Sequence, residues 1–422
     1  MPIHKKFFSL LLIFLPTQLG YHFWPDWAMV LGRRVDYLSP TLYLTDILIG
    51  LIIITWFLSS RGRSDGDAIS YQCEIASSKT PRNDKIRKVR FAIIVTLLFI
   101  AINVFFAVNK PVAIYKWLKA VEFVLLGYYI VKTKVQLSAI SYPLSVGILY
   151  SSLIAIGQFY FQHSIGGPLW WLGERTFALD TPGIARVDTQ FSIFRLRPYA
   201  TFPHPNVLGG FLAVVLPLVI ASARQRVSAS AQWLFRVSFV FGIVALVLTF
   251  SRSAIVIGIL ALAFVFFQKK KIFFFFSILI LTFSVFRLPF TFFEESVTVR
   301  QQLNVAAIRL WQTSPLFGVG LGNFLVRLPE ALPTRTIYFL QPVHNIYLLL
   351  LSEVGVVGFL FFIWFLQKIF RHPFGIWHLA FGILLVLGLV DHYPLTLQQG
   401  QLLLTLLMSL AIVDRTRNLT LY

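Results

Sequence analysis

Apolar runs of about 20 residues recur along the whole chain and are separated by polar segments. A helix of this length crosses the hydrocarbon core of a bilayer. The runs are continuous and do not alternate between polar and apolar residues, so a transmembrane β-barrel is excluded. We therefore predict an all-α, polytopic integral membrane protein with about twelve transmembrane helices.

The first run starts with Lys5 and Lys6 and could be taken for a signal peptide, but no small-residue cleavage site follows it. We interpret it as the first span. The predicted spans are residues 1–20, 41–58, 91–108, 112–131, 137–161, 207–222, 233–250, 255–267, 272–289, 346–366, 374–390 and 395–413.

Charge supports this topology. Only 13% of the residues are charged and 57% are hydrophobic, whereas a globular chain has about 25% charged residues. The formal net charge of +20 comes from lysines and arginines that collect in alternate turns, as on the cytoplasmic side of a membrane, so no nucleic acid is expected as a partner. The basic segments predicted inside include 61–90, Arg226, 269–271 and 415–417, which puts both termini in the cytoplasm. Cys73 is the single cysteine and cannot form an internal disulfide.

His344 is the strongest candidate for chemistry, because it stands with Asn345 directly before the apolar run 346–366. An imidazole has a usual pKa of about 6.5 and can accept a proton from a hydroxyl near neutral pH. The positive end of the following helix and nearby arginines favour the neutral form. The alternative is one structural hydrogen bond at the membrane interface.

Arginine dominates the basic residues of the loops predicted to face outward. Its planar guanidinium can bind two phosphate oxygens at once, whereas lysine acts as a point charge. We single out Arg197 and Arg300, and with them Arg252 and Arg309, as candidates to bind a phosphate-bearing substrate. The alternative for each is contact with lipid head groups.

Two further segments support these residues. The proline- and glycine-rich stretch 197–210 predicts a rigid outward loop that presents His204, with Asn206 as the N-cap of the next helix. Glu353 lies about 13 Å deeper than His344 along one helix and faces away from it. We predict that Glu353 packs with a buried Tyr or Arg.

The glycines of residues 315–323 predict a tight turn at the membrane surface. No predicted strand precedes this segment and no Lys-Ser/Thr pair follows it, so a nucleotide site is not supported. No His, Cys, Asp and Glu residues have metal-ligand spacing. We therefore expect neither a metal nor another cofactor.

Taken in order, these motifs resemble the O-antigen ligase and O-antigen polymerase superfamily of bacterial membrane glycosyltransferases. The resemblance covers about residues 190–365. It rests on Arg197 with Thr-Phe-Pro-His-Pro-Asn at 201–206, Ser-Arg-Ser-Ala at 251–254, Arg300 ahead of the glycine turn, and His-Asn-Ile-Tyr-Leu at 344–348. The first five predicted spans match only in hydropathy, and Asn304 stands where the family commonly has tryptophan.

The resemblance implies a metal-independent glycosyltransferase of the bacterial inner membrane, with its active site facing outward. Its donor would be an undecaprenyl-diphosphate-linked glycan and its acceptor a glycan or a lipid-linked acceptor, as in lipopolysaccharide or exopolysaccharide synthesis. A chain-length regulator is a further partner in the polymerase branch. The resemblance also implies essential roles for Arg300, His344 and Arg197, while Arg309 matches the family arginine less well by spacing.

We expect three regions: an N-terminal scaffold at 1–190, a catalytic region at 191–366 with a second outer loop at 290–343, and C-terminal spans at 367–422. The rival interpretation is a transporter or flippase for lipid-linked oligosaccharides. It requires broken helices and ionisable residues at membrane depth, such as Asp46 and Glu122. A structural anchor is a third interpretation, which leaves the outward arginines unexplained.

Overall fold

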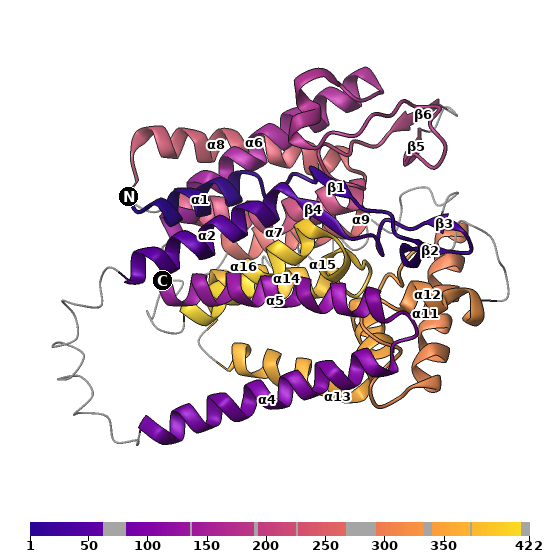
Figure 1. Cartoon of the computed structure of the whole chain (residues 1–422). Coiled ribbons are helices and arrows are strands. Elements are labelled where there is room, and N and C mark those ends of the chain that lie inside the picture. Colours follow the sequence, from indigo (N-terminus) through magenta and orange to yellow (C-terminus); the bar gives the residue numbers. More distant parts are fainter. Residues whose placement is uncertain are drawn as a thin grey trace.

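The computed structural model describes residues 1–61, 82–135, 137–189, 193–224, 227–266, 293–332, 340–371 and 374–414. Long helices lie side by side in a bundle, with the N-terminus at one end and the short strands gathered at the other (Figure 1). The helices are α1 Ile3–Ile13, α2 Leu44–Arg61, α4 Arg82–Phe106, α5 Lys110–Thr133, α6 Leu137–Phe161, α7 Pro205–Ala223, α8 Ala229–Leu248, α9 Arg252–Phe266, α11 Phe293–Thr313, α12 Phe324–Ala331, α13 Ile346–Phe370, α14 Ile376–Leu387, α15 Tyr393–Thr396 and α16 Gln398–Asp414.

Short 3₁₀ helices and antiparallel hairpins complete the strand end of the bundle. The 3₁₀ helices are η1 Asp26–Ala28 and η2 Gly167–Leu172. The strand pairs are β1 Gly20–His22 with β4 Thr41–Tyr43, β2 Met29–Val30 with β3 Arg33–Arg34, and β5 Arg186–Thr189 with β6 Ile193–Leu196. The fold is thus mostly helical, as predicted.

Among the described residues, four helices are long and apolar enough to cross a membrane: Ala139–Phe161, Pro205–Ala223, Ala229–Leu248 and Ile346–Phe370. Shorter apolar helices accompany them, including Arg252–Phe266 and Gln398–Val413. These helices support a membrane protein. The total of about twelve spans and the side on which the termini lie stay predictions. The predicted span 272–289 and the basic segments at 62–81, Arg226, 269–271 and 415–417 lie outside the described residues.

The predicted first span differs from the structure. Its helix, α1, has 11 residues and ends at Ile13, so it extends about 16 Å, roughly half a hydrocarbon core. Pro16 cannot donate a backbone hydrogen bond, and the chain continues into β1, which pairs with β4. α1 packs against α2 and α6. It is therefore supported by neighbouring helices over its short length.

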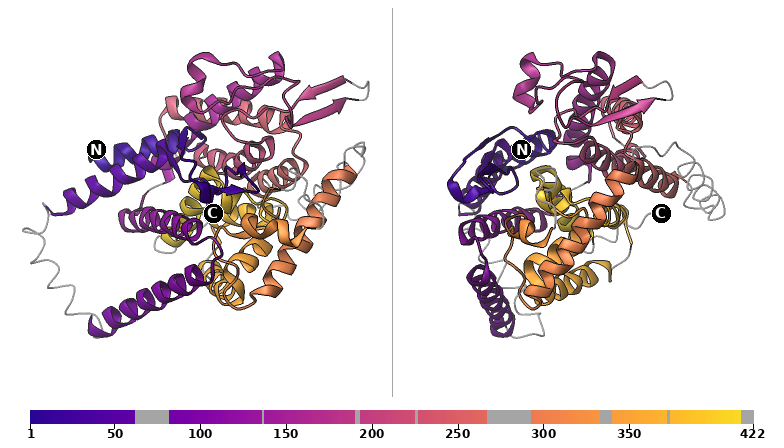
Figure 2. Two further views of the ribbon diagram at one scale, coloured as in Figure 1. Left: turned by 45° about the vertical axis from the view of Figure 1, so that its right-hand side comes forward. Right: turned by 90° about the vertical axis from the view of Figure 1, so that its right-hand side faces the viewer.

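The two segments predicted as long outward loops contain regular structure. The first holds η2 and the β5–β6 hairpin, and the second holds α11 and α12. α11 buries Leu303, Ala306, Ala307 and Leu310, which recur at the spacing of one helical face. In the end-on view, α11 crosses the end of the bundle (Figure 2). This one-sided apolar pattern is present in the sequence, but it is a weaker signal than the continuous apolar run of a membrane span.

α7 is the central helix of the bundle and is buried on nearly every side. It packs against α8, α9 and α14. An all-apolar helix is stable only when neighbours surround it, and Pro205 at its first position fits because that position needs no backbone N–H donor. α7 therefore gives the residues just before it, Arg197 to His204, a rigid support.

α13 is broken at Gly355, whose φ is +65°. The glycine turn 315–323 fills this break. The N–H of Val319 donates to the carbonyl of Ser352 at 2.9 Å, and the N–H of Val356 donates to the carbonyl of Pro315 at 2.9 Å. A helix broken inside a membrane leaves backbone groups that must find partners within the protein. The turn supplies those partners, so it lies against the interior of α13 and not only at the membrane surface.

Side-chain hydrogen bonds also stabilise the contact between the turn 315–323 and α13. The fully buried Asn103 of α4 donates from Nδ2 to the carbonyls of Phe317 and Glu353, at 2.8 and 2.9 Å. The glycines allow backbone to approach backbone. A Cβ added at Gly355 would lie 2.3 Å from the carbonyl oxygen of Leu316, and one at Gly318 would lie 2.3 Å from the carbonyl carbon of Glu353. We call this contact between the turn and the broken helix the interlock.

Replacing Gly355 with alanine is expected to destabilise the fold by about 2 kcal/mol or more, because it adds a Cβ clash to an unfavourable left-handed backbone. The measurement is the apparent Tm of the detergent-solubilised chain. Gly382→Ala is the matched control, since a Cβ at Gly382 meets nothing within 4 Å. Equal Tm values for the two variants would contradict the interlock.

Candidate active site

His344 lies directly before α13, at the strand end of the bundle. Asn345 is the N-cap of α13, and its Oδ1 accepts hydrogen bonds from the N–H groups of Tyr347 and Leu348 at 2.9 and 3.1 Å. The N–H of Ile346 donates to the carbonyl of Gly388 at 2.8 Å. These bonds fix the backbone on which the imidazole stands. In the described part of the chain, Nδ1 of His344 is buried without a hydrogen-bond partner.

A second histidine, His392, faces the first. The two ring centroids are 5.1 Å apart in an edge-on arrangement. His392 follows Asp391, whose Oδ1 accepts from the N–H of His392 at 2.8 Å, and Nδ1 of His392 lies 2.6 Å from the hydroxyl of Thr396. We call His344 and His392 the histidine pair. Asp391 and His392 were not among the site residues predicted from the sequence. The sequence feature that could have pointed to them is an aspartate next to a histidine in the short turn between two apolar runs.

Arg300 reaches this turn from α11. Its Nη1 donates to the carbonyl of Val390 at 3.0 Å, one residue before Asp391. The guanidinium therefore lies against the segment that carries Asp391 and His392.

Arg197 comes from the loop after β6. Its Nε donates to the carbonyl of Thr249 at 2.8 Å, and its Nη2 donates to Oδ1 of Asn206 at 2.6 Å. Thr249 closes α8, three residues before Arg252, the first residue of α9. The predicted N-cap of α7 needs correction: His204 is the N-cap, and its Nδ1 accepts from the N–H of Asn206 at 3.1 Å. Pro205 starts the helix one residue after His204, which leaves the amide of Asn206 free to hold Arg197.

The electrostatics tie these groups into one cluster. Burial lowers the pKa of His344 well below its usual value, and the charges of His392, Arg300 and His204 lower it further, against the opposing effect of Asp391. Burial and Arg197 lower the pKa of His204 to about 4. Both imidazoles are therefore neutral at pH 7.

Arg197 keeps its charge at pH 7. Burial, followed by the charges of Arg252 and Arg300, lowers the pKa of Arg197 to about 10, partly offset by Tyr199. Burial alone would raise the pKa of Asp391, but surrounding positive groups, Arg300 among them, lower it instead. The cluster thus combines three guanidinium groups with one carboxylate and neutral imidazoles, which is an anion-binding environment that also contains a base.

Two predicted site residues lie outside this cluster. Arg309 is on α11, about 13 Å along the helix from Arg300, and its Nη1 donates to the carbonyl of Ala331 at 3.0 Å. It holds the C-terminal end of α12. Glu353 is buried in the interlock, where its Oε1 accepts from the N–H of Phe324 at 3.3 Å. Its partner is thus a helix N-terminus and not the expected Tyr or Arg.

Two cavities lie beside the cluster. The apolar cavity, about 240 Å³, is lined by leucines and phenylalanines of α5, α12, α13 and α16, with Glu353 and Lys116 in its wall. The polar cavity, about 390 Å³, is lined by segments before β4, by α5, by η2 and by the start of α16. They share Tyr37, Lys116, Thr396 and Gln401. Within the described residues, no group of three His, Cys, Asp or Glu side chains is placed to hold a metal ion.

The structure is thus a mostly helical bundle, with helices long and apolar enough to cross a membrane, that carries buried arginines beside a histidine pair at its strand end. A family model described as O-antigen ligase matches residues 237–363, which span α8 to α13. This match, over less than a third of the chain, supports the predicted resemblance to the O-antigen ligase and polymerase superfamily. It contains Arg252, Arg300 and His344, whereas Arg197 and Asp391 lie outside it. No curated protein matches the chain.

Arg300→Gln is expected to raise the pKa of His344, because removing a nearby positive charge makes protonation of the imidazole easier. The measurement is an NMR titration of ring-¹³C histidine, with His344→Gln used to assign the signal. Arg309→Gln, on the same helix but bonded to Ala331, is expected to leave this pKa unchanged. If Arg300→Gln also leaves it unchanged, the guanidinium does not act on His344.

Proposed function

We propose that this protein is a membrane glycosyltransferase that transfers or polymerises a glycan from an undecaprenyl-diphosphate-linked donor at the outer face of the bacterial inner membrane. The observation that carries the proposal is a group of positive charges from three separate segments: Arg197 lies near Arg252 and Arg300, and Arg300 lies beside the buried histidine pair. The O-antigen ligase match supports a glycosyl-transfer enzyme with lipid-linked glycan substrates.

The arginines would bind the donor diphosphate. Guanidinium groups bind phosphate oxygens through paired, charge-assisted hydrogen bonds. As the bond between the anomeric carbon and the diphosphate oxygen breaks, negative charge grows on the leaving group. Fixed positive charges in a buried site stabilise that charge most, because they need no reorganisation during the reaction.

His344 would act on the acceptor. Its ring is neutral and its buried Nδ1 lacks a partner among the described residues, so this nitrogen is available to a hydroxyl. The acceptor oxygen attacks the anomeric carbon, its proton passes to His344, and the diphosphate leaves with the electron pair. The products are a new glycosidic bond and the lipid diphosphate.

The apolar cavity suits the lipid part of a substrate. Its wall consists mainly of leucine and phenylalanine side chains between α5, α13 and α16, and it adjoins the polar cavity through Tyr37 and Thr396. A ligand with an apolar tail and a polar head would thus meet both environments at the level of the histidine pair.

A flippase for the same lipids is the second candidate, and two observations favour it. α13 is broken at Gly355, and the ionisable groups Lys119, Asp46 and Glu122 are paired inside the bundle. However, the interlock fills the break with backbone from the same chain. Formation of a new glycosidic bond by the purified protein, without a nucleotide, separates the enzyme from the transporter.

His344→Ala and Arg300→Ala are each expected to reduce transfer by about 10²-fold or more, because one removes the base and the other a charge that stabilises the leaving group. The assay measures glycan elongation by purified protein in lipid nanodiscs, with membrane lipid-linked oligosaccharides as substrates. Arg309→Ala controls for loss of an arginine from the same helix and is expected to retain activity. Wild-type turnover by His344→Ala would rule out the imidazole as the base.

A further inference from the structure

The polar cavity lies apart from the reacting groups. Its volume of about 390 Å³ lies within the range of ligand sites, and its wall carries amide, hydroxyl and aromatic side chains in the same space. It contains neither His344 nor the arginines of the cluster in its lining. A ligand that fills it would therefore extend away from the reacting bond.

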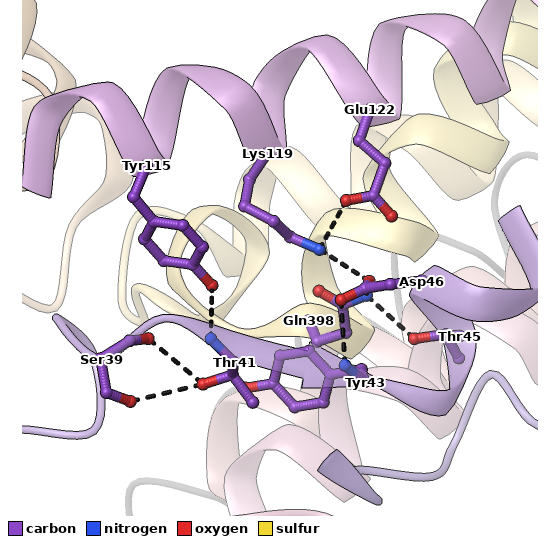
Figure 3. A network of polar contacts seen from close by, with 9 residues as sticks. All are labelled: Ser39, Thr41, Tyr43, Thr45, Asp46, Tyr115, Lys119, Glu122 and Gln398. Carbon is purple, nitrogen blue, oxygen red and sulfur yellow. Dashed lines mark hydrogen bonds and ion pairs between the residues drawn. The ribbon is translucent and has the colours of Figure 1, made fainter. Parts of the chain in front are cut away.

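A polar network lies behind one wall of this cavity, where Lys119 and Gln398 line it (Figure 3). Lys119 forms ion pairs with Asp46 at 2.6 Å and Glu122 at 2.7 Å, and Gln398 donates from Nε2 to the hydroxyl of Thr45 at 2.9 Å and to Asp46. The charge of Lys119 is matched by these carboxylates, and the rest of the lining carries both signs, with Lys116 and Arg175 beside Asp36 and Glu174. The lining thus presents polar groups and charges of both signs.

One amide in the wall is not satisfied by the protein. Gln399 is only 3% exposed and lines the cavity, and in the described part of the chain its Nε2 has no hydrogen-bond partner. An amide NH₂ has two donors, and leaving them unpaired in a buried position costs free energy. The unpaired amide therefore offers a hydrogen-bond donor at the wall of the cavity that no protein acceptor uses among the described residues.

The cavity reaches the histidine pair directly. Tyr37, in its wall, contacts the ring of His392 edge-on, with centroids 5.5 Å apart. Thr396, also in its wall, lies 2.6 Å from Nδ1 of His392. A ligand in the cavity would thus end beside the pair of imidazoles.

Aromatic residues mark the rim and the wall. Trp170 lines the cavity and is 51% exposed, while the adjacent Trp171 is 67% exposed and does not line it. Tyr115 and Tyr43 stand on the inner wall, where the hydroxyl of Tyr115 accepts from the N–H of Thr41 at 3.1 Å (Figure 3). Flat apolar rings beside amides and hydroxyls suit a ligand whose faces are apolar and whose edges carry hydroxyl groups.

We propose that the polar cavity is a saccharide subsite, which holds a short stretch of glycan while one end of it lies beside the histidine pair. Hydroxyl groups of the sugar would face Gln399 and the other amides, and a ring face would pack on Trp170. The inference rests on the proposed function, because it assigns this glycan to a substrate of that same site. The glycan belongs either to the donor or to the acceptor, which share this chemistry.

The first test compares Trp170→Ala with Trp171→Ala in the elongation assay, while donor and acceptor concentrations are varied separately. Trp170→Ala is expected to raise one KM about tenfold, equivalent to the loss of roughly one good contact, with kcat little changed. The substrate whose KM rises identifies the source of the glycan. Gln399→Leu is expected to raise the same KM. Trp171→Ala is expected to leave both the donor KM and the acceptor KM unchanged.

If neither Trp170→Ala nor Gln399→Leu changes a KM while His344→Ala is inactive, the subsite is overturned and the proposed function stands.

A binding test examines the subsite on its own, and it applies also if the wild-type protein shows no transfer at all. In a Cys73→Ser background, Trp170→Cys is labelled with a maleimide in the presence of saccharides released by mild acid from cellular lipid-linked oligosaccharides. Protection at Trp170→Cys but not at Trp171→Cys supports the subsite, and absence of protection overturns it. Undecaprenyl phosphate without sugar, expected to give no protection, is the control for the lipid.

Discussion

The interlock is the constraint on which the arrangement of the site depends. α13 is interrupted at Gly355, and backbone groups exposed by the interruption hydrogen-bond to the turn 315–323. Inside a membrane these groups have no water to bind, so the turn cannot leave without a large cost in free energy. This turn directly follows α11, which carries Arg300, while His344 stands at the start of α13. The same backbone contact therefore holds the arginine helix and the histidine helix in a fixed relation.

That fixed relation explains the electrostatics of the cluster. Arg300 bonds to the carbonyl of Val390, and so places a permanent positive charge beside Asp391 and the histidine pair. Arg197 is held separately by Thr249 and Asn206, next to the helix that begins with Arg252. The positive charge of the cluster thus comes from separately supported segments. A site preorganised in this way can bind a diphosphate and keep a base neutral beside it.

The sequence predicted the class of fold and part of the site. Continuous apolar runs predicted a helical membrane protein, and the position of His344 before such a run predicted a histidine at a helix start. The break at Gly355 was not predictable, because a positive φ depends on the tertiary contacts of the glycine, and a glycine inside an apolar run looks like any small residue.

Asp391 and His392 were missed because some 50 residues separate them from His344 along the chain, and only packing of α14 against neighbouring helices brings them together. α11 was taken for loop because its apolar face, including Leu303 and Leu310, covers only one side of a polar helix.

Arginines from three segments and the histidine pair are proposed to form one binding site for the donor diphosphate. The most direct measurement is a cryo-electron microscopy structure of the protein in a lipid nanodisc with bound undecaprenyl diphosphate. We expect diphosphate density in contact with Arg197, Arg252 and Arg300, on the side that faces His344. Diphosphate density bound elsewhere, for example at Arg309, with the three arginines turned away from His344, would contradict this proposal.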